Sequence, residues 1–102
     1  MTVARVDELA PGAWQVADLD GTQIAVFNLD GKFYAIADVC THDAGQLTGG
    51  TLEGDVIVCP RHGARFCIRT GEALSAPAFE PTDSFPVRIE AGDIQVRDHR
   101  WD

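Results

Sequence analysis

Thiol and imidazole side chains gather in two short clusters between residues 40 and 67. The first cluster holds Cys40 and His42 with one residue between them, and the second holds Cys59 and His62 with two residues between them. Two thiolates and two imidazoles form a set of four soft-to-borderline metal ligands. Such a set suits a tetrahedral zinc ion or an iron–sulfur cluster with mixed ligation. The sequence therefore predicts a metal centre built from both clusters.

Turn dipeptides mark the elements that must position these ligands. Asp20-Gly21 and Asp30-Gly31 each stand between runs rich in β-forming residues, which is a strong signal for a β-hairpin. No segment has a persuasive period of 3.6 residues, although Val6–Leu9 could form a single helical turn. The expected strands are Thr2–Val6, Trp14–Leu19, Thr22–Leu29, Lys32–Ala37, Asp55–Val58, Ala64–Thr70, Phe85–Glu90 and Asp93–Arg97. These short strands predict an all-β fold, a small antiparallel β-sandwich or barrel.

The ligand segment is the exception to this pattern of strands. Residues 41–54 contain four glycines, at positions 45, 49, 50 and 54. Such a stretch predicts a loop-rich cluster-binding subdomain, at about residues 38–78, inserted between strands of the scaffold. A chain of 102 residues is expected to form a single domain, residues 1–102, and a bound metal group would add stability to its small core.

Composition narrows the class of protein. The net charge is −8, with 8 basic and 16 acidic residues, which is the opposite of the balance expected in a nucleic-acid binder. The acidic balance serves either solubility or steering toward basic patches on partner proteins. The apolar runs are too short to span a membrane, and the first residues lack the features of a signal peptide. We expect a cytoplasmic protein with no membrane partner, whose three cysteines remain reduced.

The full motif, C-x-H-x16-C-x2-H followed directly by Gly63, resembles the signature of the Rieske iron–sulfur family. The segment 75–78 (SAPA) falls where that family has a proline-containing loop over its cluster. The resemblance implies the Rieske fold and one [2Fe–2S] cluster. It also implies that Cys40 and Cys59 hold the inner iron, while His42 and His62 hold the outer iron near the surface.

Two departures from the high-potential members of that family point to a subclass. Gly45 and Arg61 stand where those members have two disulfide-bonded cysteines, so that bridge cannot form here. Ala64 and Phe66 replace a serine and a tyrosine whose hydroxyl groups would donate to the cluster sulfurs. Hydrogen bonds to sulfur stabilise the more negative, reduced cluster. We therefore expect a low midpoint potential of roughly −150 mV, at the bottom of the Rieske range.

A small, low-potential chain of this kind resembles the ferredoxin component of a bacterial aromatic-ring-hydroxylating dioxygenase system. The resemblance implies a monomeric one-electron carrier, not an enzyme, in the catabolism of aromatic hydrocarbons. Its partners would be an NAD(P)H-dependent flavin reductase and a terminal Rieske non-haem iron oxygenase that acts on aromatic compounds. Two alternatives remain: the small Rieske subunit of a nitrite reductase-like enzyme, and an interaction module stabilised by zinc.

The remaining reactive side chains have simpler interpretations. Cys67 is expected to be an ordinary strand residue, and His99 a solvated residue of the polar tail. His99 is also the only histidine outside the motif, so a two-His-one-carboxylate iron site for oxygen activation cannot be assembled. Arg61 and Asp43, each next to a ligand histidine, are either solvated or in contact with a partner protein. Both interpretations stay open on the sequence alone.

Overall fold

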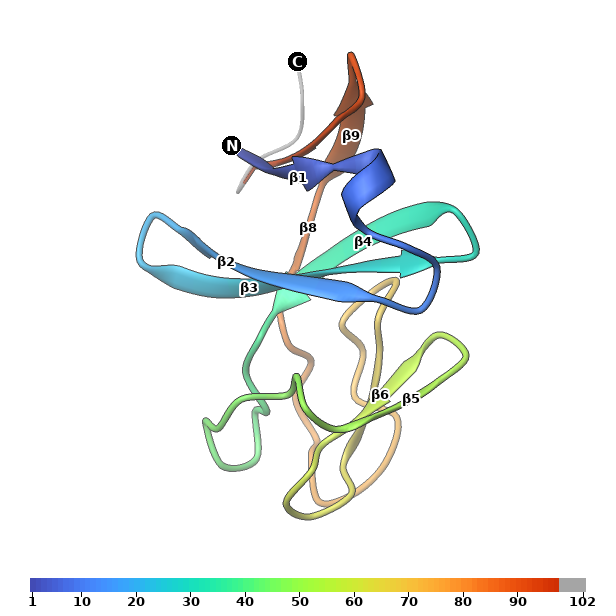
Figure 1. The fold of residues 1–102 in the computed structure, drawn as a ribbon. Helices are drawn as coiled ribbons and strands as arrows, with labels where there is room; N and C mark the ends of the chain where they lie inside the picture. The colour runs from blue at the N-terminus through green and yellow to red at the C-terminus, as the bar shows by residue number, and fades with distance from the viewer. Residues whose placement is uncertain (98–102) are drawn as a thin grey trace.

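The computed structural model describes residues 1–97, which form an elongated stack of antiparallel β-sheets (Figure 1). The principal dimensions are 40 × 25 × 18 Å. Every strand pairing among the described residues is antiparallel, and the fold class predicted from the sequence is confirmed. Within residues 1–97, no helix is long and apolar enough to cross a membrane. His99, interpreted above as a tail residue, lies outside the described residues.

The central sheet has four strands in the order β2-β3-β4-β8. They are β2 (Trp14–Leu19), β3 (Thr22–Leu29), β4 (Lys32–Ala37) and β8 (Ser84–Phe85). The turns between the first three consist of Asp20-Gly21 and Asp30-Gly31, in which all four residues have positive φ. Two-residue turns of that kind match the twist of paired strands, which is why the first three strands have the predicted bounds.

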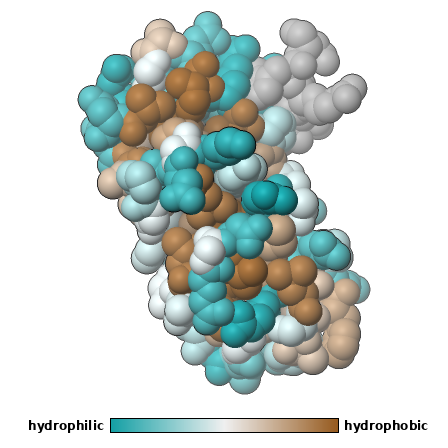
Figure 2. Space-filling model, turned by 90° about the vertical axis from the view of Figure 1, so that its right-hand side faces the viewer, coloured by the Kyte–Doolittle hydropathy of each residue, from teal (hydrophilic) through white to brown (hydrophobic). Residues whose placement is uncertain are grey.

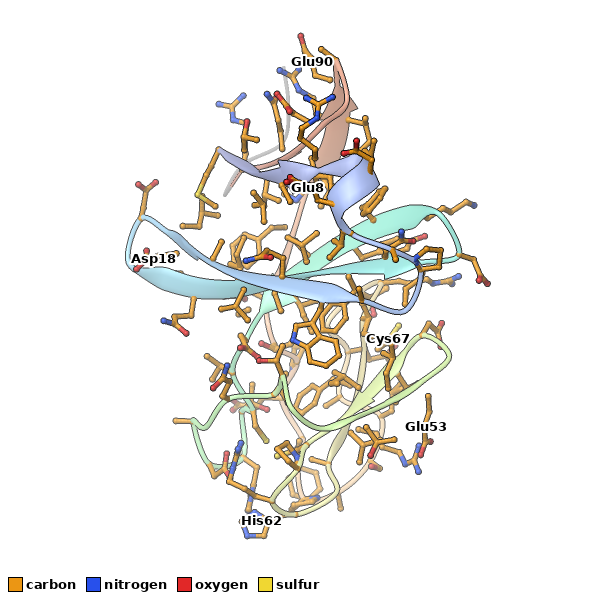
Figure 3. All side chains as sticks on the ribbon, in the orientation of Figure 1. Glu8, Asp18, Glu53, His62, Cys67 and Glu90 are labelled. Atoms are coloured by element: carbon orange, nitrogen blue, oxygen red, sulfur yellow. The ribbon has the colours of Figure 1, made fainter. Side chains whose placement is uncertain are left out.

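A three-stranded sheet covers the end of the molecule that carries Glu90 (Figure 3). Its order is β1-β10-β9, from β1 (Thr2–Arg5), β9 (Val87–Glu90) and β10 (Asp93–Val96). After β1 the chain makes one turn of 3₁₀-helix, η1 (Val6–Glu8), where the sequence allowed a single helical turn. The predicted strand Phe85–Glu90 is wrong in one respect, because Pro86 divides it into β8 and β9. Proline has no N–H to donate to a ladder, so the chain changes partner there.

The third sheet lies inside the ligand segment, at the opposite end of the molecule (Figure 1). Its order is β5-β6-β7, from β5 (Thr51–Glu53), β6 (Val56–Val58) and β7 (Arg65–Cys67). The sequence prediction was wrong for β5, which was assigned to a loop. The predicted strand Ala64–Thr70 is longer than β7, because the chain turns back after Cys67. The Cys67 carbonyl accepts from the Gly71 N–H at 2.7 Å.

Two hydrophobic cores lie on opposite faces of the central sheet. Alternate side chains of a strand point to opposite faces, and residues 24–27 of β3 are fully buried on both. Ile24 and Val26 belong to the core under the β1-β10-β9 sheet, whereas Ala25 and Phe27 belong to the core under the ligand segment. The second core also contains Cys40 and Cys59. The predicted ligand thiols are therefore fixed against the central sheet.

Candidate metal centre

The first ligand loop, residues 40–45, follows β4 and closes on itself. The Cys40 N–H donates to the Gly45 carbonyl at 2.7 Å, and the Ala44 N–H donates back to the Cys40 carbonyl at 2.7 Å. Ala44 has a φ of 61°, the left-handed conformation that lets the loop reverse direction. His42 therefore lies on a tight turn that begins at the cysteine.

The second ligand loop, residues 59–64, connects β6 to β7 and repeats this backbone pattern. The Cys59 N–H donates to the Ala64 carbonyl at 2.7 Å, and the Gly63 N–H donates to the Cys59 carbonyl at 3.1 Å. Gly63 has a φ of 75°, at the position equivalent to Ala44. The histidine differs in place, since His62 is three residues after its cysteine and His42 is two.

The two loops bring all four predicted ligands together, with sulfur inside and nitrogen outside. Cys40 and Cys59 are 0% and 2% exposed, and their sulfur atoms lie within 4.8 Å of each other. The rings of His42 and His62 meet edge to face, with centroids 4.9 Å apart. Both histidines are exposed, and Figure 3 shows His62 at the tip of the molecule farthest from Glu90.

The chemistry of this donor set fits a [2Fe–2S] cluster with two unlike irons. One side of the site offers only buried thiols, and the other offers only exposed imidazoles. Burial is the largest cause of a raised pKa at the Cys40 thiol, and the neighbouring Cys59 adds to it. Two thiolates so close together need compensating positive charge, which bound metal ions provide.

On the side of the core, the surroundings of the thiols are apolar. Ala64 and Phe66 are fully buried in the same core as the two cysteines, and neither carries a hydroxyl group. Ala78 of the predicted proline loop belongs to this core as well. The Thr41 hydroxyl donates to the Glu80 carbonyl at 2.6 Å, which fastens the continuation of that loop, two residues beyond Ala78, to the first ligand loop. These contacts separate the thiols from water.

Asp38 is a residue of the site that sequence reasoning missed. It stands at the end of β4 and is only 3% exposed. Its carboxylate accepts the Leu47 N–H at 3.0 Å, the Thr48 N–H at 2.8 Å and the Thr48 hydroxyl at 2.7 Å. The available signal was an acidic residue directly after a buried strand, two positions before a ligand.

Asp43 and Arg61 are paired with each other across the two loops. The Arg61 Nε donates to Asp43 Oδ2 at 2.5 Å, and Nη2 donates to Oδ1 at 3.0 Å. This pairing is the main reason why the pKa of Asp43 lies far below its usual range and that of Arg61 is raised. Their side chains are 21% and 36% exposed, so both reach solvent, but each is also held by the other.

Cys67 stands apart from the ligands. It lies on β7 and is half-buried between the buried Phe66 and Ile68, with the exposed Arg65 and Arg69 at the alternate positions. Its sequence interpretation as a strand residue is confirmed. Figure 3 shows Cys67 well away from His62, in the middle of the molecule.

Comparisons of this chain with a family model and with known proteins agree on one family. The family described as "Rieske [2Fe-2S] domain" matches residues 1–86. The biphenyl dioxygenase ferredoxin subunit of a Pseudomonas species is 45% identical over 92 residues, covering 89% of this chain and 84% of the relative. The 3-phenylpropionate/cinnamic acid dioxygenase ferredoxin subunit of Shigella flexneri is 50% identical over 74 residues, covering 72% of this chain and 70% of the relative.

Solved structures agree with this result. The ferredoxin of carbazole 1,9a-dioxygenase from Nocardioides aromaticivorans superposes with a TM-score of 0.89 and 32% identity, over 94% of each chain. A complex of reduced oxygenase and oxidized ferredoxin in carbazole 1,9a-dioxygenase includes a chain with a TM-score of 0.91 and 34% identity. That match covers 99% of this chain and 94% of the other.

Proposed function

This chain belongs to the Rieske [2Fe–2S] domain family, and from that premise we propose that it is a low-potential one-electron carrier of a bacterial aromatic-ring dioxygenase system. It takes electrons from an NAD(P)H-dependent flavin reductase and passes them to a terminal Rieske oxygenase. The two named relatives are ferredoxin subunits of dioxygenases, and one similar structure is a complex of ferredoxin with oxygenase. The protein is an electron-transfer component and not itself an enzyme.

The observation that carries this proposal is the pair of buried thiols facing a pair of exposed imidazoles. We assign Cys40 and Cys59 to the inner iron of the cluster, and His42 and His62 to the outer iron. A bound [2Fe–2S] cluster supplies a centre that gains and loses one electron. The imidazole rings reach the surface, so they offer a short path between that centre and a partner protein. We also take residues 1–102 as one domain, whose cluster-binding part spans about 38–78.

The residues around the thiols support a low potential. Ala64 and Phe66 place a methyl and a phenyl group in the core beside the cysteines, where neither side chain can donate a hydrogen bond to sulfur. Because such donors favour the reduced cluster, their absence from these two positions lowers the midpoint potential. We expect a value of roughly −150 mV, near the lower end for this class of cluster.

The surface offers features that suit docking near the imidazoles. Hydrophobic side chains reach the surface in the lower half of the molecule, which carries the ligand loops (Figure 2). Phe79, in the loop fastened to the first ligand loop, is 84% exposed. The net charge of −8 suits partners with basic docking surfaces. We expect a monomer in the cytoplasm, where the three free thiols would remain reduced until metal is loaded.

The two alternative functions that the sequence left open are less well supported. The named relatives are ferredoxins, which does not favour the small subunit of a nitrite reductase-like enzyme. Zinc would suit the same four donors, but the family match is to an iron–sulfur domain. A purified protein that is colourless and holds one zinc without labile sulfide would restore the zinc alternative.

Reconstituted electron transfer is the direct test of the proposal. The loaded protein should accept one electron from NADH through the reductase of the biphenyl dioxygenase system, and pass it to the matching oxygenase. Anaerobic absorbance changes would follow reduction, and product formation would follow delivery. A redox titration should give the low potential stated above. A midpoint well above 0 mV would contradict the low-potential assignment, and failure of every flavin reductase tried would count against the shuttle.

A further inference from the structure

We propose that Arg61 and Asp43 are positioning residues for the metal centre, whose ion pair clasps the two ligand loops together and keeps the charge beside the ligands balanced. Arg61 belongs to the loop 59–64 and Asp43 to the loop 40–45, so the pair crosses between the loops. The inference rests on the ligand set proposed above. It concerns how this chain holds that set in place.

The contacts of the Arg61 guanidinium all run to the opposite ligand segment. Nε and Nη2 donate to the two oxygens of Asp43 at 2.5 and 3.0 Å, which is the bidentate arrangement. Nη1 donates to the Gln46 carbonyl at 2.8 Å, just beyond the first loop. Three donors of one side chain thus hold two consecutive parts of the neighbouring segment. A planar fork of this kind fixes orientation as well as distance.

Gly45 makes room for the clasp. A β-carbon at this position would lie 2.5 Å from both Cζ and Nη2 of Arg61 and 2.8 Å from Nε, which is closer than such contacts allow. Gly45 is not in the left-handed region, so its backbone conformation does not require glycine. The Gly45 N–H also donates to Asp43 Oδ1 at 2.9 Å, which holds the carboxylate toward Arg61. The lack of a side chain at Gly45 therefore leaves the space that the guanidinium occupies.

The carboxylate of Asp43 lies against both kinds of ligand. Its Oδ2 is 3.6 Å from Nδ1 of His62, and a carboxylate oxygen lies within 4.8 Å of the sulfur atoms of Cys40 and Cys59. An uncompensated negative charge at this place would oppose the arrival of an electron. Arg61 compensates that charge, since its guanidinium is bonded to both oxygens. Removal of Arg61 leaves the negative charge of Asp43 beside the ligands, and removal of Asp43 leaves the positive charge of Arg61 there.

Three variants separate the two roles of the ion pair, which are to hold the loops together and to balance the charge beside the ligands. They are Arg61→Gln, Asp43→Asn and the double variant. All three break the bidentate pair, so we expect each to release its cluster to a chelator severalfold faster than wild type. The double variant should be no faster than the worse single variant, because the same contact is lost once. The midpoint potential should fall in Arg61→Gln, rise in Asp43→Asn and return toward wild type in the double variant. A merely structural role would not give shifts of opposite sign.

Gly45→Ala provides an independent route to the same clasp. It leaves both charges in the chain but displaces the guanidinium from Asp43, so release should become faster, while the potential should fall by less than in Arg61→Gln because the positive charge stays nearby. In the Arg61→Gln background it should add little. The matched control is Arg65→Gln, which breaks the exposed ion pair of Arg65 with Glu53 in the same part of the molecule. This control should leave the release rate near that of wild type.

The outcomes distinguish this inference from the function on which it rests. A wild-type protein that takes up no iron and sulfide would overturn the proposed function and the clasp with it. A loaded wild type whose Arg61→Gln variant releases its cluster no faster than the Arg65→Gln control would overturn the clasp alone. Potentials that move in the same direction in both single variants would overturn the charge-balancing half. Circular dichroism of each variant checks that the sheets have formed.

Discussion

The two ligand loops have the same backbone turn but different supports. In each loop the cysteine N–H bonds to the carbonyl five residues later, and its carbonyl accepts the N–H four residues later. The loop 59–64 closes a hairpin, because Val58 of β6 pairs directly with Arg65 of β7. The loop 40–45 follows β4 and runs into residues 46–48, which are not in a strand. The backbone N–H groups of Leu47 and Thr48 donate to the buried carboxylate of Asp38, which takes the place of a neighbouring strand.

The comparison shows that a strand ladder and a single buried side chain can position equivalent turns. A ladder spreads its support over several backbone bonds, so the loss of one side chain costs it little. A carboxylate concentrates its support in one residue, and a single substitution removes all of it. The two loops should therefore respond alike when a ligand is removed, and differently when a support is removed.

Removal of a thiol should have the largest effect, and an equal one in the two loops. We expect Cys40→Ala and Cys59→Ala each to abolish binding of the [2Fe–2S] cluster, since each leaves the inner iron with one protein ligand. Iron and acid-labile sulfide per chain, together with visible absorbance, measure the loss. Cys67→Ala is the control and should keep the full cluster. A variant of either loop that retained the cluster would show that its cysteine is not a ligand.

Removal of the carboxylate should separate the loops. Asp38→Ala leaves two buried backbone N–H groups and the Thr48 hydroxyl without their acceptor, and we expect it to lower the free energy of unfolding by about 3 kcal/mol. Asp38→Asn keeps an oxygen acceptor and should cost about 1 kcal/mol. Urea denaturation measures both changes.

Hydrogen exchange shows where the Asp38 effect is felt. In Asp38→Asn, which remains folded, the Ala44 amide should lose protection while the Gly63 amide keeps it. Equal loss of protection in both loops would mean that Asp38 supports the whole ligand segment, and the contrast between ladder and carboxylate would then fail.

The sequence was sufficient where one local signal determines the structure. Turns such as Asp20-Gly21 fix the strands on either side through backbone conformation alone, so those bounds were predicted without error. The positions of Cys40 and Cys59 within their spacing pattern likewise pointed to a shared metal site. Where the pattern was ambiguous, as at Thr51–Glu53 among glycines, the strand forms only because β6 is available as a partner.

The polar contacts of the site could not be predicted, because they depend on which loops meet. Asp43 and Arg61 are 18 residues apart, and their pairing requires the two ligand loops to converge. The support of Thr48 by Asp38 spans 10 residues with no regular element between them. In the sequence, the charges of Asp38 and Asp43 would be explained equally well by positions on an exposed surface. Only the fold reveals that one carboxylate is buried and the other is paired.

The fourth residue after each cysteine provides a smaller test of the likeness between the loops. Gly63 has a φ of 75° and an added β-carbon would meet nothing within 4 Å, so Gly63→Ala should cost only backbone strain, about 1 kcal/mol. The midpoint of urea denaturation measures this cost. Gly45→Ala is a useful contrast, since its cost comes from the Arg61 side chain and not from the backbone. A cost of Gly63→Ala much above about 1 kcal/mol would reveal a contact in the second loop that the first loop lacks.

Ala44→Gly should produce the smallest effect, and one of opposite sign. Ala44 already has a φ of 61°, so this loop carries the strain that Gly63 avoids in the other. Glycine would relieve that strain but would lose more conformational entropy on folding, and the two terms partly cancel. We expect a net stabilisation of about 0.5 kcal/mol, measured by urea denaturation of Ala44→Gly beside wild type. A clear destabilisation would mean that the Ala44 methyl group makes a stabilising contact, and the equivalence of the two turns would then extend to their backbone alone.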